Sequence, residues 1–287
     1  MLDLTVIILT KNEEKNIEKC INSFNGISKR FVVVDSYSDD TTKEICERLS
    51  IKYNISFYER SFISHADQFN WALKNTQLNT NWIMRIDADE EMTKELIEEF
   101  ENKIPTLDES VSGVFLNRRI YFMNKWIKYG GMYPIKVLRL FRRNKGYCEQ
   151  KLMDEHIVTN EGINISFKND FIDYNQKNLE WWINKHNWYS NLEVNDYLKN
   201  KNFEQQVNSK FLGNSTERKR WLKNIVYYKT PLLRRAKWYF MYRYFIRLGF
   251  LDGKEGLIFH FLQGYWYRFL IDAKIHEQNV NNQDPKK

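Results

Sequence analysis

Three short, largely apolar runs near the start of the chain, each followed by polar residues, restrict the folds that are open to it. The runs are Leu4–Leu9, Phe31–Val34 and Trp82–Ile86. Such runs, rich in β-branched residues, are typical of strands that are buried on both faces. Apolar residues at helical spacing follow the runs. This alternation predicts an α/β domain with a mainly parallel sheet flanked by helices.

The polar clusters that follow the three runs are the first candidates for a functional site. They are Thr10–Glu13, Asp35–Asp40 and Asp87–Glu91, which lie up to about 80 positions apart in the chain. Ligands of such sheets bind beyond the carboxyl ends of the parallel strands. We therefore expect the three clusters to meet at one edge of the sheet.

Asp87 and Asp89 flank a single small residue at the end of the third run. Carboxylates in this spacing can share a hard divalent cation, and such an ion stabilises a diphosphate as a leaving group. The alternative is that these acids only begin the next helix. Their place after a buried strand favours the metal site.

The cluster after the second run contains Asp35, Ser36, Ser38 and Asp40. A carboxylate at a strand end can accept hydrogen bonds from a ribose or from the edge of a base. The same residue types also favour turns and helix caps for purely local reasons. Both interpretations stay open at this point.

A further acidic cluster, Asp154, Glu155 and His156, follows the basic stretch Arg139–Arg143. A carboxylate here can act as a general base toward an acceptor hydroxyl, and the arginines of the basic stretch can bind phosphate. The alternatives are a solvated acidic turn and solvated arginines. His156 has no second ligand at a metal-binding spacing.

The C-terminal part of the chain is basic and aromatic. Residues 201–287 hold 17 Lys/Arg against 7 Asp/Glu, a net charge of +10, whereas the whole chain carries +7. Trp238–Leu251 and Leu257–Ile271 are too short and interrupted to span a bilayer, but helices of this composition can lie in the membrane interface. The alternative is that they pack as core or in a dimer. No nucleic-acid-binding signature is present, so we expect no nucleic-acid partner.

The cysteines and the first residues indicate the cellular compartment. Cys20, Cys46 and Cys148 are too few and too scattered for a disulfide scaffold, and residues 1–10 lack the features of a secretory signal. We therefore expect a reducing, cytoplasmic environment. The motifs of dinucleotide-binding folds, P-loop enzymes and serine hydrolases are missing, which removes the usual support for those classes.

Taken in order, several segments resemble family 2 glycosyltransferases, and the later ones resemble the bacterial branch that builds lipopolysaccharide core and exopolysaccharide. The segments are Thr10–Glu14, Val34–Thr41, Gln68 with Asn70, Ile86–Glu90, Leu138–Arg143, Asp154–His156, Gly249–Gly256 and Trp266–Lys274. The resemblance touches most of the chain. It is specific for the family and not for the substrate.

The resemblance implies a GT-A fold and an inverting transfer from a nucleotide-diphosphate sugar, commonly with Mn²⁺ or Mg²⁺. The residues that it assigns to the nucleotide or substrate are Thr10, Asn12, Glu13, Asp35, Ser36, Gln68, Asn70, Asp87 and Arg139. It implies that Asp89, with Asp87, holds the metal. Glu155 occupies the place of the catalytic base with Asp154 as its rival, because many relatives have Glu-Asp where this chain has Asp-Glu-His.

We expect three parts: a GT-A catalytic domain over residues 1–200, a basic aromatic helical region over 201–276 for membrane, acceptor or dimer contacts, and a polar tail over 277–287. The predicted function is transfer of a hexose from a UDP-sugar to a lipid-linked saccharide, on the cytoplasmic face of the membrane. The rivals are a sugar-phosphate nucleotidyltransferase and a non-catalytic, membrane-associated assembly module. A homo-oligomer stays open.

Overall fold

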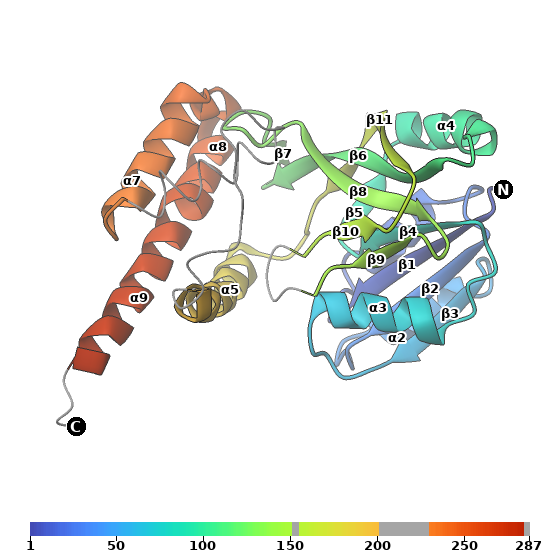
Figure 1. Cartoon of the computed structure of the whole chain (residues 1–287), viewed down its shortest axis with the longest axis horizontal. Coiled ribbons are helices and arrows are strands. Elements are labelled where there is room, and N and C mark those ends of the chain that lie inside the picture. The colour runs from blue at the N-terminus through green and yellow to red at the C-terminus, as the bar shows by residue number, and fades with distance from the viewer. Residues whose placement is uncertain (151–154, 201–229, 284–287) are drawn as a thin grey trace. The chain divides into compact units, whose positions relative to one another are not determined.

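The computed structural model describes residues 1–150, 155–200 and 230–283 (Figure 1). The chain divides into two compact units. The first holds residues 1–128 and 132–177, and the second holds residues 129–131 with the described residues from 178 onward. The helix that spans residues 179–200 therefore groups with the C-terminal part of the chain.

The first unit is built on one large sheet with the strand order β3-β2-β1-β4-β8-β6-β11-β5. The pairings among β1, β2, β3 and β4 are parallel, whereas β8 runs antiparallel to both β4 and β6. The strands of this sheet are β1 Leu4–Thr10, β2 Arg30–Asp35, β3 Ile55–Glu59, β4 Trp82–Asp87, β5 Glu90–Met92, β6 Val111–Phe122, β7 Lys125–Trp126, β8 Ile135–Arg142 and β11 Ile163–Asp173. A separate ribbon pairs β9 Gly146–Cys148 with β10 Ile157–Thr159.

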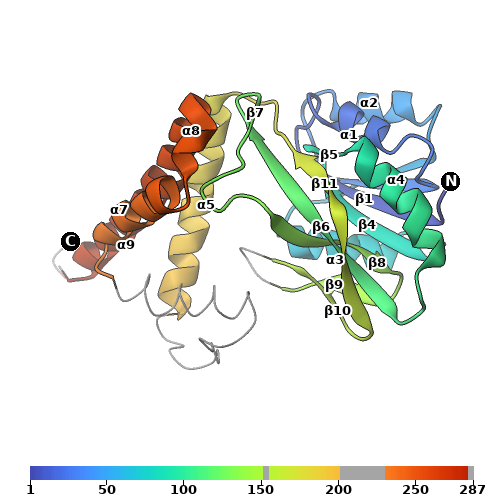
Figure 2. The ribbon, with the colours of Figure 1, turned by 90° about the horizontal axis from the view of Figure 1, so that it is seen from above.

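Helices cover both faces of the parallel strands, which explains why the strands are largely apolar. Alternate residues of a strand point to opposite faces. Val6 and Ile8 of β1 pack in a cluster with α1, α2 and α4, whereas Ile7 packs with α3 on the other face (Figures 1 and 2). The helices are α1 Ile17–Ser23, α2 Thr42–Leu49, α3 His65–Asn75 and α4 Lys94–Lys103, followed by a 3₁₀ turn at Ile104–Thr106.

The second unit is helical. The long helices α5 and α9 pack together around the buried residues Val194, Tyr267, Ile271 and Ile275. Its elements are α5 Leu179–Asn200, α7 Arg234–Met241, a π-helix Tyr242–Ile246, a 3₁₀ turn Gly249–Asp252, α8 Gly253–Phe259, a π-helix His260–Trp266 and α9 Tyr267–Gln283. Helix α9 includes residues 277–283 of the predicted polar tail.

The predicted fold class is confirmed: an α/β sheet flanked by helices is followed by a helical, aromatic-rich C-terminal region. The half of the sheet that the N-terminal runs form is entirely parallel. The other half is mixed, because β8 inserts antiparallel between β4 and β6. Among the described helices, none combines the length and apolarity that crossing a bilayer requires.

His186 of α5 gives the second unit an expected sensitivity to acid. Its ring stacks on Trp182 with centroids 3.5 Å apart, and burial lowers the pKa of the imidazole to about 4. An unfolded histidine has a pKa of about 6.5, so the unfolded state takes up the proton first as the pH falls. Above about pH 6.5 the titration of His186 therefore leaves the free energy of unfolding unchanged. As the pH falls from about 6.5 to 4, it lowers that free energy.

We therefore expect the free energy of unfolding to fall across that window and to fall less steeply in a His186→Gln variant. Urea unfolding at a series of pH values measures the slope. A His276→Gln variant, altered at an exposed position of α9, should keep the wild-type slope. If the His186→Gln slope equals that of the wild type, His186 does not titrate in this way.

Candidate functional site

The three predicted polar clusters meet at the carboxyl ends of β1, β2 and β4. Thr10 pairs with Asp35 across β1 and β2, and Leu9 pairs with Asp87 across β1 and β4. The register therefore places the last residues of the three strands side by side. The predicted convergence of these clusters at one sheet edge is confirmed.

Asp35 lies buried at the end of β2 and is hydrogen-bonded both to β1 and to its own loop. Its Oδ1 accepts hydrogen bonds from Thr10 Oγ1 at 2.8 Å and Ser38 Oγ at 2.6 Å, and its Oδ2 accepts from the Ser38 backbone N–H at 2.6 Å. The bonds from Ser38 are the local turn chemistry that the sequence left open. They also fix the carboxylate, whose Oδ2 can accept a further bond from a ligand.

The loops after β1 and β2 bind each other. Asn12 has a positive φ of 57°, its backbone N–H donates to Ser38 Oγ at 2.7 Å, and its Oδ1 accepts from the Asp39 N–H at 3.0 Å. Asparagine tolerates this left-handed conformation better than most residues. Asn12 therefore holds the two loops together.

Gln68 and Asn70 of α3 have different surroundings. Gln68 is buried, and its amide bonds Ser36 Oγ at 3.2 Å and the Arg60 guanidinium at 3.1 Å. Asn70 exchanges two hydrogen bonds with the Cys148 backbone, at 2.7 and 2.9 Å. Gln68 thus touches the loop after β2, whereas the Asn70 side chain attaches α3 to β9.

A buried arginine in β4, Arg85, joins two carboxylates that the sequence analysis treated separately. Its Nε lies 3.4 Å from Asp87 Oδ1, and another guanidinium nitrogen lies 3.4 Å from Glu155 Oε1. The Arg85 side chain is 7% exposed and stacks over the Phe69 ring. Glu155, the predicted base, is therefore held beside the end of β4. Asp154, its rival, lies outside the described residues.

Arg139 of β8 adds a second cation to this cluster. Its guanidinium contacts Asp87 Oδ2 at 3.2 Å and forms an ion pair with the buried Glu90, whose other oxygen accepts from the Asp87 N–H at 2.9 Å. Burial alone would raise the pKa of Asp87, but Arg139 and Arg85 hold that pKa well below its ordinary value. Burial raises the pKa of Glu90 to about 8. In the structure the Arg139 guanidinium contacts carboxylates, so its predicted contact with phosphate stays a prediction.

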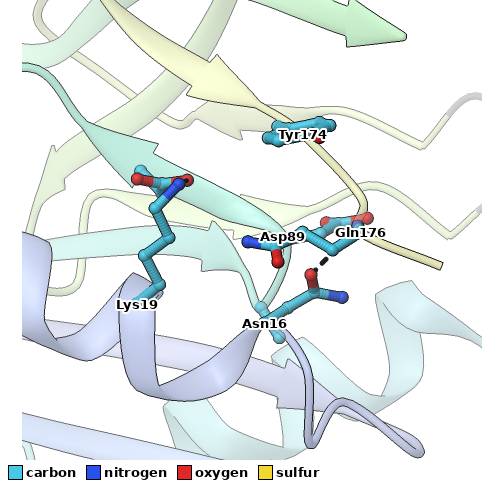
Figure 3. Close-up of a pocket in the computed structure, with 7 residues that line it drawn as sticks. Asn16, Lys19, Asp89, Tyr174 and Gln176 are labelled. Carbon is cyan, nitrogen blue, oxygen red and sulfur yellow. Dashed lines mark hydrogen bonds and ion pairs between the residues drawn. The ribbon is translucent and has the colours of Figure 1, made fainter. Parts of the chain in front are cut away.

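Asp89 lies in a shallow hollow beside this cluster, with Asn16, Tyr174 and Gln176 around it (Figure 3). Its Oδ2 accepts a hydrogen bond from Asn175 Nδ2 at 2.8 Å. Lys19, on the rim of the hollow, pairs with Glu91 at 2.7 Å. The hollow is polar and bears both signs of charge.

Glu13, in the loop between β1 and α1, faces the same region. Its Oε1 accepts from Lys177 Nζ at 2.8 Å, and its Oε2 accepts from Asn16 Nδ2 at 2.7 Å. Burial and the neighbouring charge of Asp89 raise the pKa of the Glu13 carboxyl. The Glu13 side chain is thus engaged by protein groups.

Asp87 and Asp89, the predicted metal ligands, differ in how well they can bind a divalent cation. Over residues 1–150, 155–200 and 230–283, no three His, Cys, Asp or Glu side chains gather in a metal-binding arrangement. Both oxygens of Asp87 face arginines, whereas Asp89 Oδ1 accepts no hydrogen bond from the described residues. Mg²⁺ is commonly held by one or two carboxylates together with water and substrate phosphates. The donor set fits a cation that a diphosphate shares, with Asp89 as the better protein ligand.

Sequence reasoning missed Arg85 and Glu90. The signal for Arg85 was present: it is a charged residue inside an otherwise apolar strand, two positions before Asp87 and hence on the same face. Glu90 follows Asp89 directly, and no pattern in the sequence distinguishes its buried carboxylate from the half-buried carboxylate of Glu91. The contact between Arg85 and Glu155 joins residues 70 positions apart and depends on the tertiary fold.

Comparisons with known proteins agree with this geometry. The model of Glycosyl transferase family 2 matches residues 5–165. The lipopolysaccharide core biosynthesis glycosyltransferase LpsC of Rhizobium meliloti is 29% identical over 281 residues, which cover 97% of this chain and 94% of that protein. The uncharacterized glycosyltransferase RC0292 of Rickettsia conorii is 24% identical over 98% of this chain and 92% of its own length.

Among solved structures, S. aureus TarS residues 1–349 in complex with UDP-GlcNAc covers 100% of this chain and 93% of that chain, at 14% identity and a TM-score of 0.45. The family model spans more than half of the 287 residues, including the ends of β1, β2 and β4. The chain therefore belongs to glycosyl transferase family 2 and is a glycosyltransferase.

Proposed function

We propose that this glycosyltransferase moves a hexose from a UDP-sugar to a lipid-linked saccharide, with inversion, in lipopolysaccharide or other cell-surface polysaccharide synthesis. The observation that carries the proposal is the Arg85 bridge, which holds the carboxylates of Asp87 and Glu155 at one strand end. The similarity to LpsC supports a lipopolysaccharide-type acceptor. We place the protein at the cytoplasmic face of the membrane, where such an acceptor would be met.

Glu155 is the proposed base. Single-step inversion needs one group that accepts the proton of the acceptor hydroxyl while its oxygen attacks the anomeric carbon. The Glu155 side chain is 14% exposed, and its Oε1 accepts from Arg85, which orients the carboxylate. Its Oε2 can then accept the hydroxyl proton. The proton passes to Glu155, and the diphosphate leaves with the electrons of the broken glycosidic bond.

The donor would occupy the edge formed by the loops after β1, β2 and β4. Asp35, fixed by Thr10 and Ser38, is the proposed partner of the uracil or ribose, and Ser36 and Gln68 lie next to it. Asp87, ionised by its two arginines, is the proposed ribose contact. When Mn²⁺ or Mg²⁺ is bound at Asp89, it supplies positive charge to the leaving diphosphate.

A transfer assay tests the proposal. The full chain would be incubated with Mn²⁺, a lipid-linked saccharide fraction and, in turn, radiolabelled UDP-glucose, UDP-galactose and UDP-N-acetylglucosamine. We expect one donor to release UDP in step with label that enters the lipid fraction. Pyrophosphate release from UTP and a sugar 1-phosphate would support the nucleotidyltransferase instead. UDP binding without turnover of any donor would support the non-catalytic module.

Arg85→Lys tests the bridge itself. Lysine keeps the positive charge but lacks the planar fork that reaches two carboxylates at once. We expect the turnover rate to fall about tenfold or more while the KM of the donor changes little, because the base loses its orientation. Arg143→Lys is the matched control, since Arg143 is exposed at the end of β8 and donates to the Leu78 carbonyl. Equal kinetics in the two variants would mean that Arg85 does not position Glu155.

A further inference from the structure

The stretch between residues 237 and 258 in the second unit exposes many apolar side chains. Trp238 is 67% exposed and Ile246 is 72% exposed. We call the exposed apolar side chains of this stretch the aromatic face. They are Trp238, Met241, Tyr242, Phe245, Ile246, Leu248, Phe250, Leu251, Leu257 and Ile258. Ten exposed apolar side chains among residues 237–258 are a concentration uncommon on soluble proteins, and such concentrations mark a contact with another apolar body.

The interior of the same helices holds polar residues as well as the apolar Ala236 and Phe259. Arg243 and Asp252 are 3% exposed, and His260 is fully buried. Arg243 donates to the Gln263 side chain at 2.7 Å and to the Gly130 carbonyl at 3.3 Å, and Asp252 accepts from the Tyr129 N–H at 2.9 Å. A surface helix in water has the opposite pattern, with its apolar stripe inward. Polar groups inside and apolar groups outside are the arrangement of a protein that faces lipid.

The charges around the aromatic face indicate which apolar body it contacts. The exposed charged residues of this stretch are Lys237, Arg247 and Lys254, and all are cations. Its two acids are Asp252, which is buried, and Glu255, which is half-buried. Basic residues beside aromatic ones suit an anionic membrane surface. A second copy packed on this face by two-fold symmetry would bring like charges together.

We propose that the aromatic face is a membrane-binding surface that inserts among the headgroups of an anionic bilayer. Helix α7 and the elements that follow it are short, so they lie in the interface and do not cross it. Aromatic side chains prefer that depth, and the cations contact lipid phosphates. The inference rests on the proposed function only in that a lipid-linked acceptor would be met at the same surface.

Vesicle flotation of the full chain tests this surface. The lipids are phosphatidylglycerol mixed with phosphatidylethanolamine, and phosphatidylcholine alone serves as the neutral comparison. We expect the wild type to float with the anionic vesicles, and less at high salt or with phosphatidylcholine. A variant that combines Ile246→Glu and Leu251→Glu should bind the anionic vesicles at least about tenfold more weakly than the wild type does. Ile51→Glu, altered at a 90% exposed position outside the face, is the matched control and should bind as the wild type does.

A fluorescent label identifies the occupant of the face. Cys20, Cys46 and Cys148 are buried, so an environment-sensitive dye should react selectively with a cysteine introduced by Ile246→Cys. We expect its emission to shift to the blue with anionic vesicles, whereas a dye introduced through Ile51→Cys should not respond. A shift that depends on protein concentration without vesicles would show a second copy on the face and overturn the proposal. Wild-type protein that does not float would also overturn it.

The failure of this proposal is distinguishable from failure of the proposed function. UDP affinity should be the same in the wild type and in the Ile246→Glu, Leu251→Glu variant, because the substitutions lie on exposed positions of the second unit. If the protein turns over a donor in detergent but does not bind vesicles, the proposed membrane surface is excluded and the proposed function stands. If the protein binds vesicles but turns over no UDP-sugar, the proposed function is excluded and the proposed membrane surface stands.

Discussion

Glu155→Gln is expected to lower the rate of transfer by about 10²–10⁴-fold while UDP-sugar affinity stays within about twofold of the wild type. Glutamine has the same shape as glutamate and can still accept the hydrogen bond from Arg85, which lies 3.4 Å away. It cannot take up the proton of an acceptor hydroxyl at neutral pH. UDP release under saturating donor measures the rate, and calorimetry measures the affinity.

The matched control for this change is Glu161→Gln, because Glu161 is exposed and lies just beyond β10, where it pairs with Lys145. It should transfer at the wild-type rate. Full activity in Glu155→Gln would exclude Glu155 as the base. Asp154→Asn would then be the next variant to assay.

Asp89→Asn is expected to remove the metal dependence of UDP binding, with a loss of about tenfold or more in affinity when Mn²⁺ is present. Asparagine keeps an oxygen that can accept the Asn175 bond, so the hollow around residue 89 should persist. It removes the negative charge that a divalent cation requires. Calorimetric titrations of UDP with Mn²⁺ and with EDTA measure the two affinities.

Glu91→Gln is the control for the metal, because Glu91 lines the same hollow but its carboxylate pairs with Lys19. This variant should keep the response to Mn²⁺. If Asp89→Asn also keeps it, another group holds the metal. Asp87 would then be examined, although its two oxygens face Arg85 and Arg139.

Much of the first unit could be predicted because its signals are local. A strand buried on both faces is apolar at nearly every position, so β1 and β2 are visible in the sequence without any knowledge of their neighbours. The polar residues after them follow from the same pattern, since strand ends in parallel sheets share one edge. The meeting of Thr10, Asp35 and Asp87 is therefore a consequence of order along the chain.

The partners of the charged side chains could not be predicted, because they depend on elements distant in the sequence. Arg139 contacts Asp87 and Glu90 only because β8 inserts antiparallel beside β4. The Asn70 amide is used by Cys148, 78 positions away. Neither contact has a local signal in the sequence. Each contact also uses hydrogen-bonding groups that the side chain could otherwise offer to a ligand.

The aromatic end of the chain shows a third case. Helical segments with aromatic residues on every side are compatible with a core and with a membrane interface. The sequence left both interpretations open for Trp238–Leu251. The structure buries Arg243 and exposes Phe245, at 3% and 49%, and this difference depends on which side faces the π-helix His260–Trp266 and the loop at residues 129–131.

The most direct test of the proposed donor site is calorimetric titration of the wild-type chain with UDP, first with Mn²⁺ and then with EDTA. If the edge formed by Asp35, Asp87 and Asp89 holds a UDP-sugar with a divalent cation, UDP should bind with Mn²⁺ and bind weakly or not at all with EDTA. Absence of UDP binding under both conditions would contradict the proposed donor.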